Sequence, residues 1–407
     1  MSTVLQITID GNTASTGRIA EAIGKLAITR GWNSYIAHGR FTRASESWII
    51  KIGSAFDVFL HGLQTRFFDR HGLGSKNATL KLVDQIKAIK PDIIHLHSLH
   101  GYYINYEVLF NYLAGTSIPV IWTFHDCWSM TGHCSNSDFV GCDRWKTQCH
   151  HCPQKTDYPA SYFIDRSREN YNLKKRLFTS VANMTVVSVS KWLNGIVQDS
   201  FLGGFPRQVI YNGVDVDIFI PDSDHQKVKA KWKIGDGFMI LGVAGIWQER
   251  KGLYDFYKLS ERICKNDVIV LVGLSKSQLK ELPSNIIGIM HTENQQELKD
   301  LYATADVFLN LSVEETFGLP TAEALACGTP AVVYNATACP EVIDRETGIR
   351  VNKNDIDGLL DAIKKIRKNG KEFYSGACRA RAVNCFNKND RFAEYVDLYE
   401  KLLISKS

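Results

Sequence analysis

The sequence has 407 residues, of which 44% are hydrophobic and 22% are charged. This length predicts two domains, and the composition is that of a soluble globular protein. No apolar run approaches the roughly 20 residues of a spanning helix, and the N-terminus lacks the pattern of a signal peptide, so we expect a cytoplasmic location.

The net charge of +5 is unevenly distributed. Residues 1–210 contain 22 Lys and Arg against 15 Asp and Glu, whereas residues 211–407 contain 26 against 28. A basic half suits an anionic membrane surface or a diphosphate-linked acceptor, although a mildly basic face is common and no dense Lys/Arg cluster stands out. Because no basic stripe is interleaved with aromatic residues, we expect no nucleic-acid partner.

The first half of the chain alternates apolar runs with amphipathic segments. Apolar runs predict strands at residues 4–10, 34–38, 92–97, 118–124, 184–190 and 209–212. Helical spacing of apolar residues predicts helices at 16–30 and 80–89. Residues 40–74 show no clear period and stay unassigned. This alternation favours a parallel, doubly wound sheet.

The second half repeats the pattern. Strands are predicted at 238–244, 268–272, 286–290, 307–311 and 331–334, and helices at 253–263, 295–303, 322–326 and 356–367. Turn residues at 212–221 indicate a linker, and a last helix at 391–403 has an apolar face that could pack back on either domain. We therefore expect an α/β protein with two domains, whose ligands bind at the carboxyl ends of the strands.

One stretch of the second half, residues 312–330, combines a strand end, a tight loop and a short helix. Gly318 and Pro320 suit the turn and the first helical position, and Gly328 suits the helix stop. The first turn of such a helix offers N–H groups to phosphates. Glu315 and Glu323 bracket it, and carboxylates accept hydrogen bonds from sugar hydroxyls. A capped helix with two solvated glutamates explains the pattern equally well.

Three other loops follow predicted strands. Arg250 and Lys251 are adjacent cations at a strand-to-helix turn, which suits a diphosphate or simply a solvated surface. Gly17 lies after the first strand, where it would let a ligand approach the backbone. That loop lacks the G-x-G-x-x-G fingerprint, which argues against a nicotinamide enzyme. His125 follows the strand at 118–124, where a structural histidine also fits.

A cysteine cluster interrupts the first half of the chain. Its members are Cys134, Cys142, Cys149 and Cys152. Four thiolates can hold a structural zinc tetrahedrally, and the last pair has C-x-x-C spacing. The first two gaps differ from a standard zinc finger, so free thiols in a loop-rich insert are the alternative. In a reducing compartment we do not expect disulfides.

These motifs together resemble a known family. Residues 315–330 (ETFGLPTAEALACGTP) resemble the E-x7-E signature of retaining nucleotide-sugar glycosyltransferases of the GT-B fold, known as glycosyltransferase group 1 and family 4. Residues 187–193 and 209–215 look like further landmarks, so the resemblance covers nearly the whole chain. Residues 122–159 are similar to colanic-acid-type exopolysaccharide galactosyltransferases.

The resemblance implies two Rossmann-like domains that face each other across a cleft. Residues 1–212 would form the acceptor-side domain, with a Cys-rich insert at 127–160. Residues 213–390 would bind the nucleotide sugar, and residues 391–407 would form a helix that packs back on the first domain.

The resemblance also implies roles for single residues. Glu323 would hold the ribose, Glu315 the hydroxyls of the donor sugar, and Lys251 would neutralise the leaving diphosphate. His125 would lie near the reacting end of the donor sugar. Gly17 would lie near the diphosphate from the other domain.

Further diphosphate contacts are implied by the same family. Backbone N–H groups at Phe317, Gly318 and Leu319 would cradle the diphosphate. The family usually has an arginine where this chain has Ile246. Arg250 is therefore our candidate for the second cation.

As to activity, the resemblance implies transfer of a hexose, with retention, from a UDP- or GDP-linked sugar. The acceptor would be a lipid-linked or oligosaccharide precursor of an exopolysaccharide, capsule or O-antigen lipopolysaccharide, with peripheral contact at the inner membrane. Asp215 and Asp217 have the spacing of a metal motif but lie in the predicted linker, so we expect metal-independent catalysis without a cofactor. A nucleotide-sugar epimerase of the same fold and a zinc-containing, non-catalytic binding protein are the alternatives.

Overall fold

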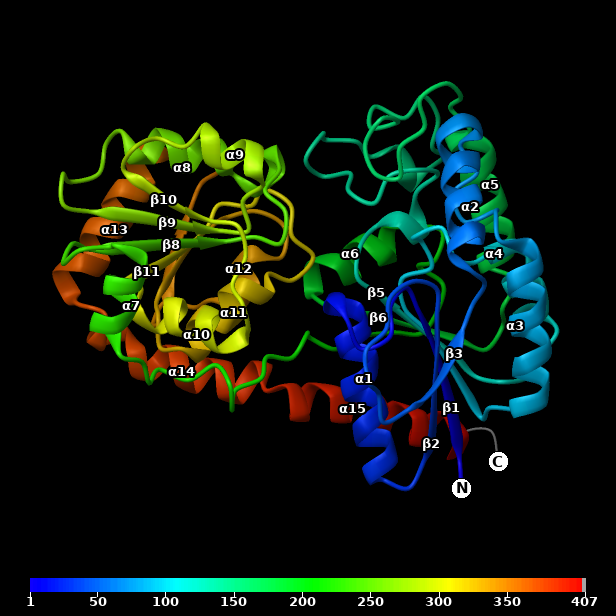
Figure 1. The fold of residues 1–407 in the computed structure, drawn as a ribbon. Coiled ribbons are helices and arrows are strands. Elements are labelled where there is room, and N and C mark those ends of the chain that lie inside the picture. The colour runs from blue at the N-terminus through cyan, green and yellow to red at the C-terminus, as the bar shows by residue number, and fades with distance from the viewer. Residues whose placement is uncertain (405–407) are drawn as a thin grey trace. The chain divides into compact units, whose positions relative to one another are not determined.

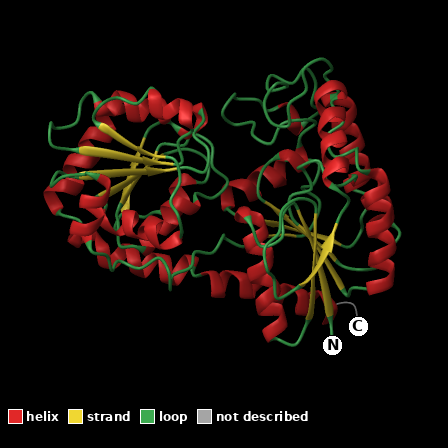
Figure 2. Ribbon diagram, in the orientation of Figure 1, coloured by secondary structure: helices red, strands yellow, loops and turns green. Residues whose placement is uncertain are grey.

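The computed structural model describes residues 1–404, which divide into two compact units (Figure 1). Of the described residues, unit 1 comprises 1–211 and 391–404, and unit 2 comprises Asn212–Asp390. The boundaries expected after residues 212 and 390 lie within one residue of these divisions. Each unit contains one parallel sheet covered by helices on both faces (Figure 2). The predicted α/β class is confirmed.

The sheet of unit 1 has the strand order β3-β2-β1-β4-β5-β6-β7. Its strands are β1 Thr3–Thr8, β2 Asn33–His38, β3 Trp48–Lys51, β4 Ile93–Leu96, β5 Val120–Phe124, β6 Met184–Ser188 and β7 Arg207–Val209. The central strands β4, β5 and β6 are buried along their whole length. Because helices cover both faces, these strands are mostly apolar, with few polar residues such as His95 of β4, which is why the sequence predicted them.

Helices of unit 1 flank this sheet. They are α1 Ala14–Thr29, α2 Ala55–Phe68, α3 Lys76–Ile89, α4 Tyr106–Ala114, α5 Ser167–Phe178 and α6 Lys191–Asp199, with short 3-10 turns η1 Trp128–Met130 and η2 Arg144–Lys146. The last helix, α15 Lys388–Ile404, buries Phe392, Tyr395 and Tyr399 in the same hydrophobic cluster as Ile19 of α1 and Ile93 of β4. The C-terminal helix therefore completes the core of unit 1.

The sheet of unit 2 has the strand order β10-β9-β8-β11-β12-β13. Its strands are β8 Met239–Val243, β9 Val268–Val272, β10 Ile286–Ile289, β11 Val307–Asn310, β12 Ala331–Tyr334 and β13 Gly348–Val351. Its helices are α7 His225–Trp232, α8 Leu253–Ser260, α9 Lys276–Lys280, α10 Gln295–Thr304, α11 Leu319–Ala326, α12 Cys339–Val342, α13 Ile356–Asn369 and α14 Glu372–Phe386, with the 3-10 turn η3 Glu249–Lys251.

Two segments differ from the sequence expectation. Residues 40–74, left unassigned, contain β3 and α2. The predicted linker begins as ordered structure: Val214 is buried, its N–H donates to the carbonyl of Phe386 at 2.7 Å, and the N–H of Lys388 donates to the carbonyl of Val214 at 2.9 Å. This backbone pairing fixes the start of unit 2 against the end of α14.

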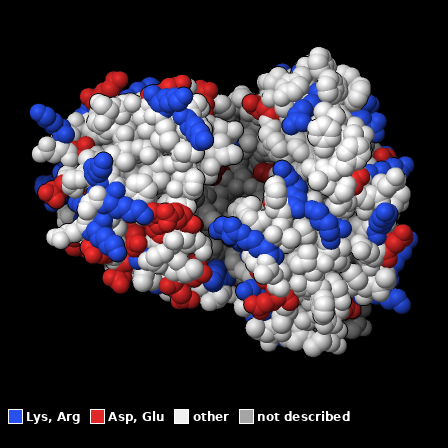
Figure 3. Space-filling view, in the orientation of Figure 1, with Lys and Arg blue, Asp and Glu red and all other residues white. Residues whose placement is uncertain are grey.

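Within residues 1–404, no helix has both the length and the apolar content to cross a bilayer. On the face shown in Figure 3, Lys and Arg are scattered over the surface and do not gather into one dense patch. Both observations concern only the part of the chain that the structure describes.

Candidate active site

The predicted donor loops of unit 2 lie at the carboxyl ends of two neighbouring strands. The chain leaves β8 toward β9 and leaves β11 toward β12, on opposite sides. Ligands of open parallel sheets bind at such a switch point. There Lys251 Nζ and Glu315 Oε1 form an ion pair between the two loops, with side chains 16% and 17% exposed.

Further hydrogen bonds fix the loop that contains Glu315. Ser312 Oγ donates to Glu315 Oε1 at 3.1 Å, and the N–H of Glu315 donates to Thr337 Oγ1 at 2.9 Å. Arg250 donates from its guanidinium to the carbonyl of Glu314 at 3.3 Å. Both predicted cations, on the loop after β8, thus contact the loop that contains Glu315, and these bonds orient the Glu315 carboxylate.

The start of α11 has the backbone geometry that the sequence predicted. Gly318 precedes the helix with φ of +97°, a left-handed conformation that favours glycine. Pro320 lies in the first turn, where its missing N–H costs nothing. Phe317 is 2% exposed, and its ring packs on Phe386 with the ring centres 5.5 Å apart. The ring therefore supports the loop, and the predicted contact of the Phe317 N–H with a diphosphate stays a prediction.

Glu323 lies on α11 and has a partner that sequence reasoning missed. Tyr302, on α10, donates from its hydroxyl to Glu323 Oε2 at 2.9 Å. Burial and the charge of Glu323 raise the pKa of Tyr302 well above its ordinary value. Tyr302 therefore remains a donor and fixes one oxygen of Glu323.

In unit 1, His125 ends a chain of hydrogen bonds that crosses three adjacent strands. Gln6 on β1 donates from Nε2 to the carbonyl of Ala20 at 2.7 Å. Gln6 Oε1 lies 3.1 Å from His97 Nε2, at the end of β4. His97 Nδ1 lies 3.2 Å from His125 Nε2, at the end of β5.

The donor and acceptor roles in this chain follow from its first member. A carbonyl only accepts, so the amide nitrogen of Gln6 faces Ala20 and its oxygen faces His97. That oxygen requires a proton on His97 Nε2. Burial lowers the pKa of His97 well below 6.5, so the ring is neutral and its Nδ1 accepts. His125 must then carry its proton on Nε2. Burial lowers the pKa of His125 to about 4, which leaves Nδ1 as an acceptor.

A second polar group lies next to His125. Asp126 Oδ2 accepts from His100 Nε2 at 2.6 Å, and Asp126 Oδ1 accepts the N–H of Trp128 at 2.8 Å. His100 Nδ1 lies 2.9 Å from the hydroxyl of Tyr158. Burial raises the pKa of Asp126, but the interactions with His100 and Trp128 outweigh it, so the pKa is lowered overall. Asp126 is therefore an ionised carboxylate.

Gly17 lies in the first turn of α1 against the loop that follows β1. A Cβ there would come within 2.5 Å of the carbonyl oxygen of Asp10 and 3.3 Å of the N atom of Asn12. The close packing of helix and loop is sufficient reason for glycine at this position. Its predicted contact with a diphosphate stays a prediction.

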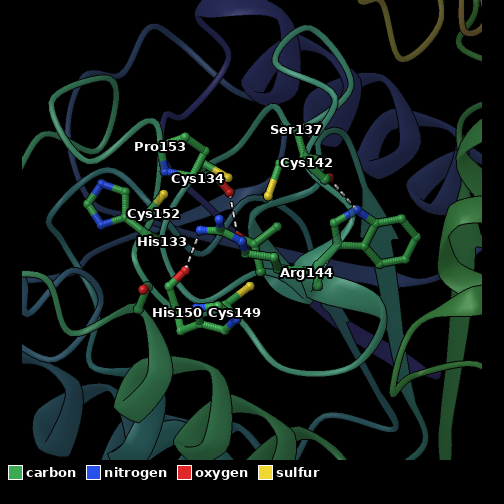
Figure 4. A pocket seen from close by; sticks show the side chains of 12 residues that line it. His133, Cys134, Ser137, Cys142, Arg144, Cys149, His150, Cys152 and Pro153 are labelled. Carbon is green, nitrogen blue, oxygen red and sulfur yellow. Dashed lines mark hydrogen bonds between the residues drawn. The ribbon is translucent and has the colours of Figure 1, made fainter.

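The four cysteines of the insert line one small pocket, with a cavity of about 10 Å³ (Figure 4). Arg144, which also lines it, donates to the carbonyl of His150 at 2.8 Å. The Sγ atom of Cys149 accepts the N–H of Gly132 at 3.2 Å. Within residues 1–404, no three His, Cys, Asp or Glu side chains form a group that could hold a metal ion. The zinc therefore stays a prediction.

The ionisable groups around this pocket have shifted pKa values. A hydrogen bond with Cys152 and burial raise the pKa of Cys134, while the same bond lowers the pKa of Cys152 to about 7. Burial raises the pKa of Cys149 to about 11. Lys174 is fully buried beside them, its ammonium 3.4 Å from the ring centre of Trp128, and burial lowers its pKa to about 7.

Comparison with known families identifies both parts of the chain. Residues 30–218 match the model described as Glycosyltransferase Family 4, and residues 237–369 match the model described as Glycosyl transferases group 1. Together the matches cover more than three quarters of the chain. The chain is a GT-B glycosyltransferase.

Relatives and solved structures agree with this assignment. The enzyme is 23% identical to the putative colanic acid biosynthesis glycosyl transferase WcaC of Escherichia coli K12, over 98% of this chain and 100% of the relative. Its fold is similar to that of sucrose-phosphate synthase from Thermosynechococcus elongatus (TM-score 0.73, 16% identity, full coverage of both chains). It is also similar to Anabaena Alr3699/HepE in complex with UDP-glucose (TM-score 0.66, 16% identity, 98% and 100% coverage). At these identities the solved structures establish the fold alone.

The enzyme gathers its predicted site residues into two groups. Lys251, Arg250 and Glu315 lie on two neighbouring loops of unit 2, whereas Gly17 and His125 belong to unit 1. Sequence reasoning missed Gln6, His97 and Tyr302, which support the predicted residues. A polar side chain inside an otherwise apolar strand, as Gln6 is in β1, was the available signal.

Proposed function

We propose that the enzyme transfers a hexosyl group, with retention, from a UDP- or GDP-linked sugar to a growing surface-polysaccharide precursor. The observation that carries the proposal is the Lys251–Glu315 ion pair at the switch point of unit 2, beside the Gly318 turn that starts α11. This arrangement supplies a cation, N–H donors and a carboxylate acceptor where such sheets bind ligands. The full-length similarity to a protein named for colanic acid biosynthesis supports the polysaccharide acceptor.

The proposed mechanism is electrostatic. The barrier to glycosyl transfer is charge separation between a developing oxocarbenium ion and a departing diphosphate, and fixed cations and N–H dipoles lower it. Lys251 would release Glu315 to the sugar hydroxyls and turn to the diphosphate, assisted by Arg250. Glu323, held by Tyr302, would accept from the ribose. None of these steps requires a metal ion, and we propose metal-independent catalysis.

The test is a panel of UDP- and GDP-sugars assayed for hydrolysis and transfer, with purified Lys251→Ala and Glu323→Ala variants. Both variants should lose at least about a hundredfold of activity, the usual effect of removing an electrostatic contact to the reacting groups. Lys280→Ala and Glu281→Ala, both on the exposed surface of unit 2, are the matched controls. Near wild-type activity in both site variants would refute the assignment.

Product analysis distinguishes the remaining activities. An epimerase changes the free nucleotide sugar without an acceptor, whereas the proposed transferase forms a glycoside only with one. The anomeric configuration of that glycoside, read by NMR, tests retention. Absence of turnover with every donor would favour a non-catalytic binding protein.

A further inference from the structure

Helix α2 of unit 1 has its apolar side facing outward. Its exposed residues include Phe56, Phe59, Leu60, Phe67 and Phe68, which are 40–65% exposed. Among the described residues, all of unit 2 has only three large hydrophobic residues that are at least 40% exposed. At 100° per residue, Phe56, Phe59, Leu60 and Phe67 lie on one face of the helix.

The opposite face of α2 is polar and fixed to the protein. His61 and Thr65 are buried. His61 Nε2 accepts the N–H of Gly72 at 2.9 Å, and His61 Nδ1 lies 3.0 Å from Ser75 Oγ. Since these bonds hold the polar side inward, the helix cannot turn its aromatic side into the core without breaking them.

The apolar surface continues onto residues 162 and 163, which follow the Cys-rich insert. Phe163, 69% exposed, stacks on Phe67 with ring centres 5.5 Å apart and planes at 8°. The N–H of Tyr162 donates to the carbonyl of Arg66 at 2.9 Å, which ties this segment to α2. Contiguous exposed apolar surface of this kind marks an interaction site.

The charges beside this surface favour an anionic partner. Arg66 and Arg70 are exposed at the C-terminal end of α2. Of the two carboxylates of this segment, Asp69 is buried against His133 at 2.6 Å, whereas Asp57 caps the other end of α2 through Ser54, away from the arginines. The surface therefore offers aromatic side chains with cations at their edge, which is the chemistry of the bilayer interface.

We propose that the outer face of α2 and Phe163 dock on a bilayer that contains anionic lipid. The aromatic rings would enter the headgroup region, and Arg66 and Arg70 would contact lipid phosphates. The argument uses only the surface of unit 1, so vesicle binding and sugar transfer can fail independently.

The experiment is co-sedimentation of the full-length protein with vesicles of phosphatidylcholine alone or mixed with phosphatidylglycerol. Mixed vesicles should bind the protein more tightly, and added salt should weaken that binding. Phe163→Glu should lower binding at least about tenfold, the factor expected when one buried aromatic contact is lost. Phe373→Glu, at an equally exposed phenylalanine of unit 2 (70%), is the matched control and should bind normally.

Arg66→Glu should lower binding about fivefold or more, and only to the anionic vesicles. Equal loss in the Phe163 and Phe373 variants, or no binding of the wild type to anionic vesicles, would overturn the proposal. Dimerisation that Phe59→Glu abolishes, without vesicle binding, would assign the surface to a second copy of the chain. Circular dichroism of each variant checks that the fold is retained.

Discussion

Replacing Gln6 with leucine tests the hydrogen-bond chain that ends at His125. The variant removes the acceptor that lies 3.1 Å from His97 Nε2. It puts an apolar side chain of similar size in its place in the core of unit 1. His97 can then move its proton to Nδ1 to avoid a buried, unsatisfied N–H group. In that form it no longer accepts from His125, so the proton on His125 is no longer confined to Nε2.

The size of the effect follows from the bonds that are lost. In the variant, His97 Nε2 has no partner, either as an N–H without an acceptor or, after the proton moves, as an acceptor without a donor. A buried polar group without a partner costs about 1–3 kcal/mol, which is the expected loss in free energy of unfolding. A hydrogen bond worth about 1–1.5 kcal/mol shifts the tautomer ratio by about five- to tenfold. Both nearby rings stay neutral, since burial holds the pKa of His95 at about 3 and that of His125 at about 4.

The assay is nitrogen-15 NMR of the histidine rings, combined with steady-state kinetics on the best donor. We expect His125 to carry its proton on Nε2 in the wild type and to show a mixture in Gln6→Leu. If His125 acts on the donor, kcat should fall while KM changes little. Thr123→Val is the control. It removes a 2.8 Å hydrogen bond to His95 in the same sheet, but it leaves the hydrogen bonds from Gln6 through His97 to His125 in place.

Two results would refute this reasoning. His125 protonated on Nδ1 in the wild type would show that the donor roles are reversed. An unchanged His125 tautomer in Gln6→Leu, with the stability loss present, would show that Gln6 supports the core without orienting His125. A change in Thr123→Val equal to that in Gln6→Leu would point to general loosening of the sheet.

Three further changes have defined outcomes. Tyr302→Phe should weaken UDP- or GDP-sugar binding about tenfold by calorimetry, because a hydrogen bond to a charged group is lost, whereas Tyr374→Phe should not. Asp69→Asn should cost about 3 kcal/mol in urea unfolding. Burial lowers the pKa of His133, but the interaction with Asp69 outweighs burial, so the pKa is raised overall. The loss of stability in Asp69→Asn should therefore be largest below pH 6.5, where His133 is charged, and should shrink as the pH rises through the raised pKa. Elemental analysis should find one zinc per wild-type chain and none in Cys149→Ser; a metal-free wild type would contradict the zinc prediction.

Both sheets could be predicted from the sequence because their central strands are mostly apolar. A strand such as β5, Val120–Phe124, is buried at every position and has one polar residue, Thr123, so its apolar sequence is enough to predict a buried strand. The loops after such strands could be predicted for the same reason. Glu315 and Lys251 are each predicted as site residues from a loop that follows a strand. In the structure the two residues form one ion pair.

Helix α2 and the His125 chain could not be predicted, for opposite physical reasons. α2 reverses the rule that apolar residues face inward: its phenylalanines are exposed while His61 is buried, so the search for a core-facing stripe found no helix there. The chain from Gln6 to His125 depends on the register of three strands, which brings together residues 91 and 28 positions apart. A local sequence pattern does not show which distant side chains a residue will hydrogen-bond, nor whether an apolar helix face will be buried or exposed. These two features are therefore where the structure adds most to the sequence, one at the predicted catalytic histidine and the other at the proposed membrane surface.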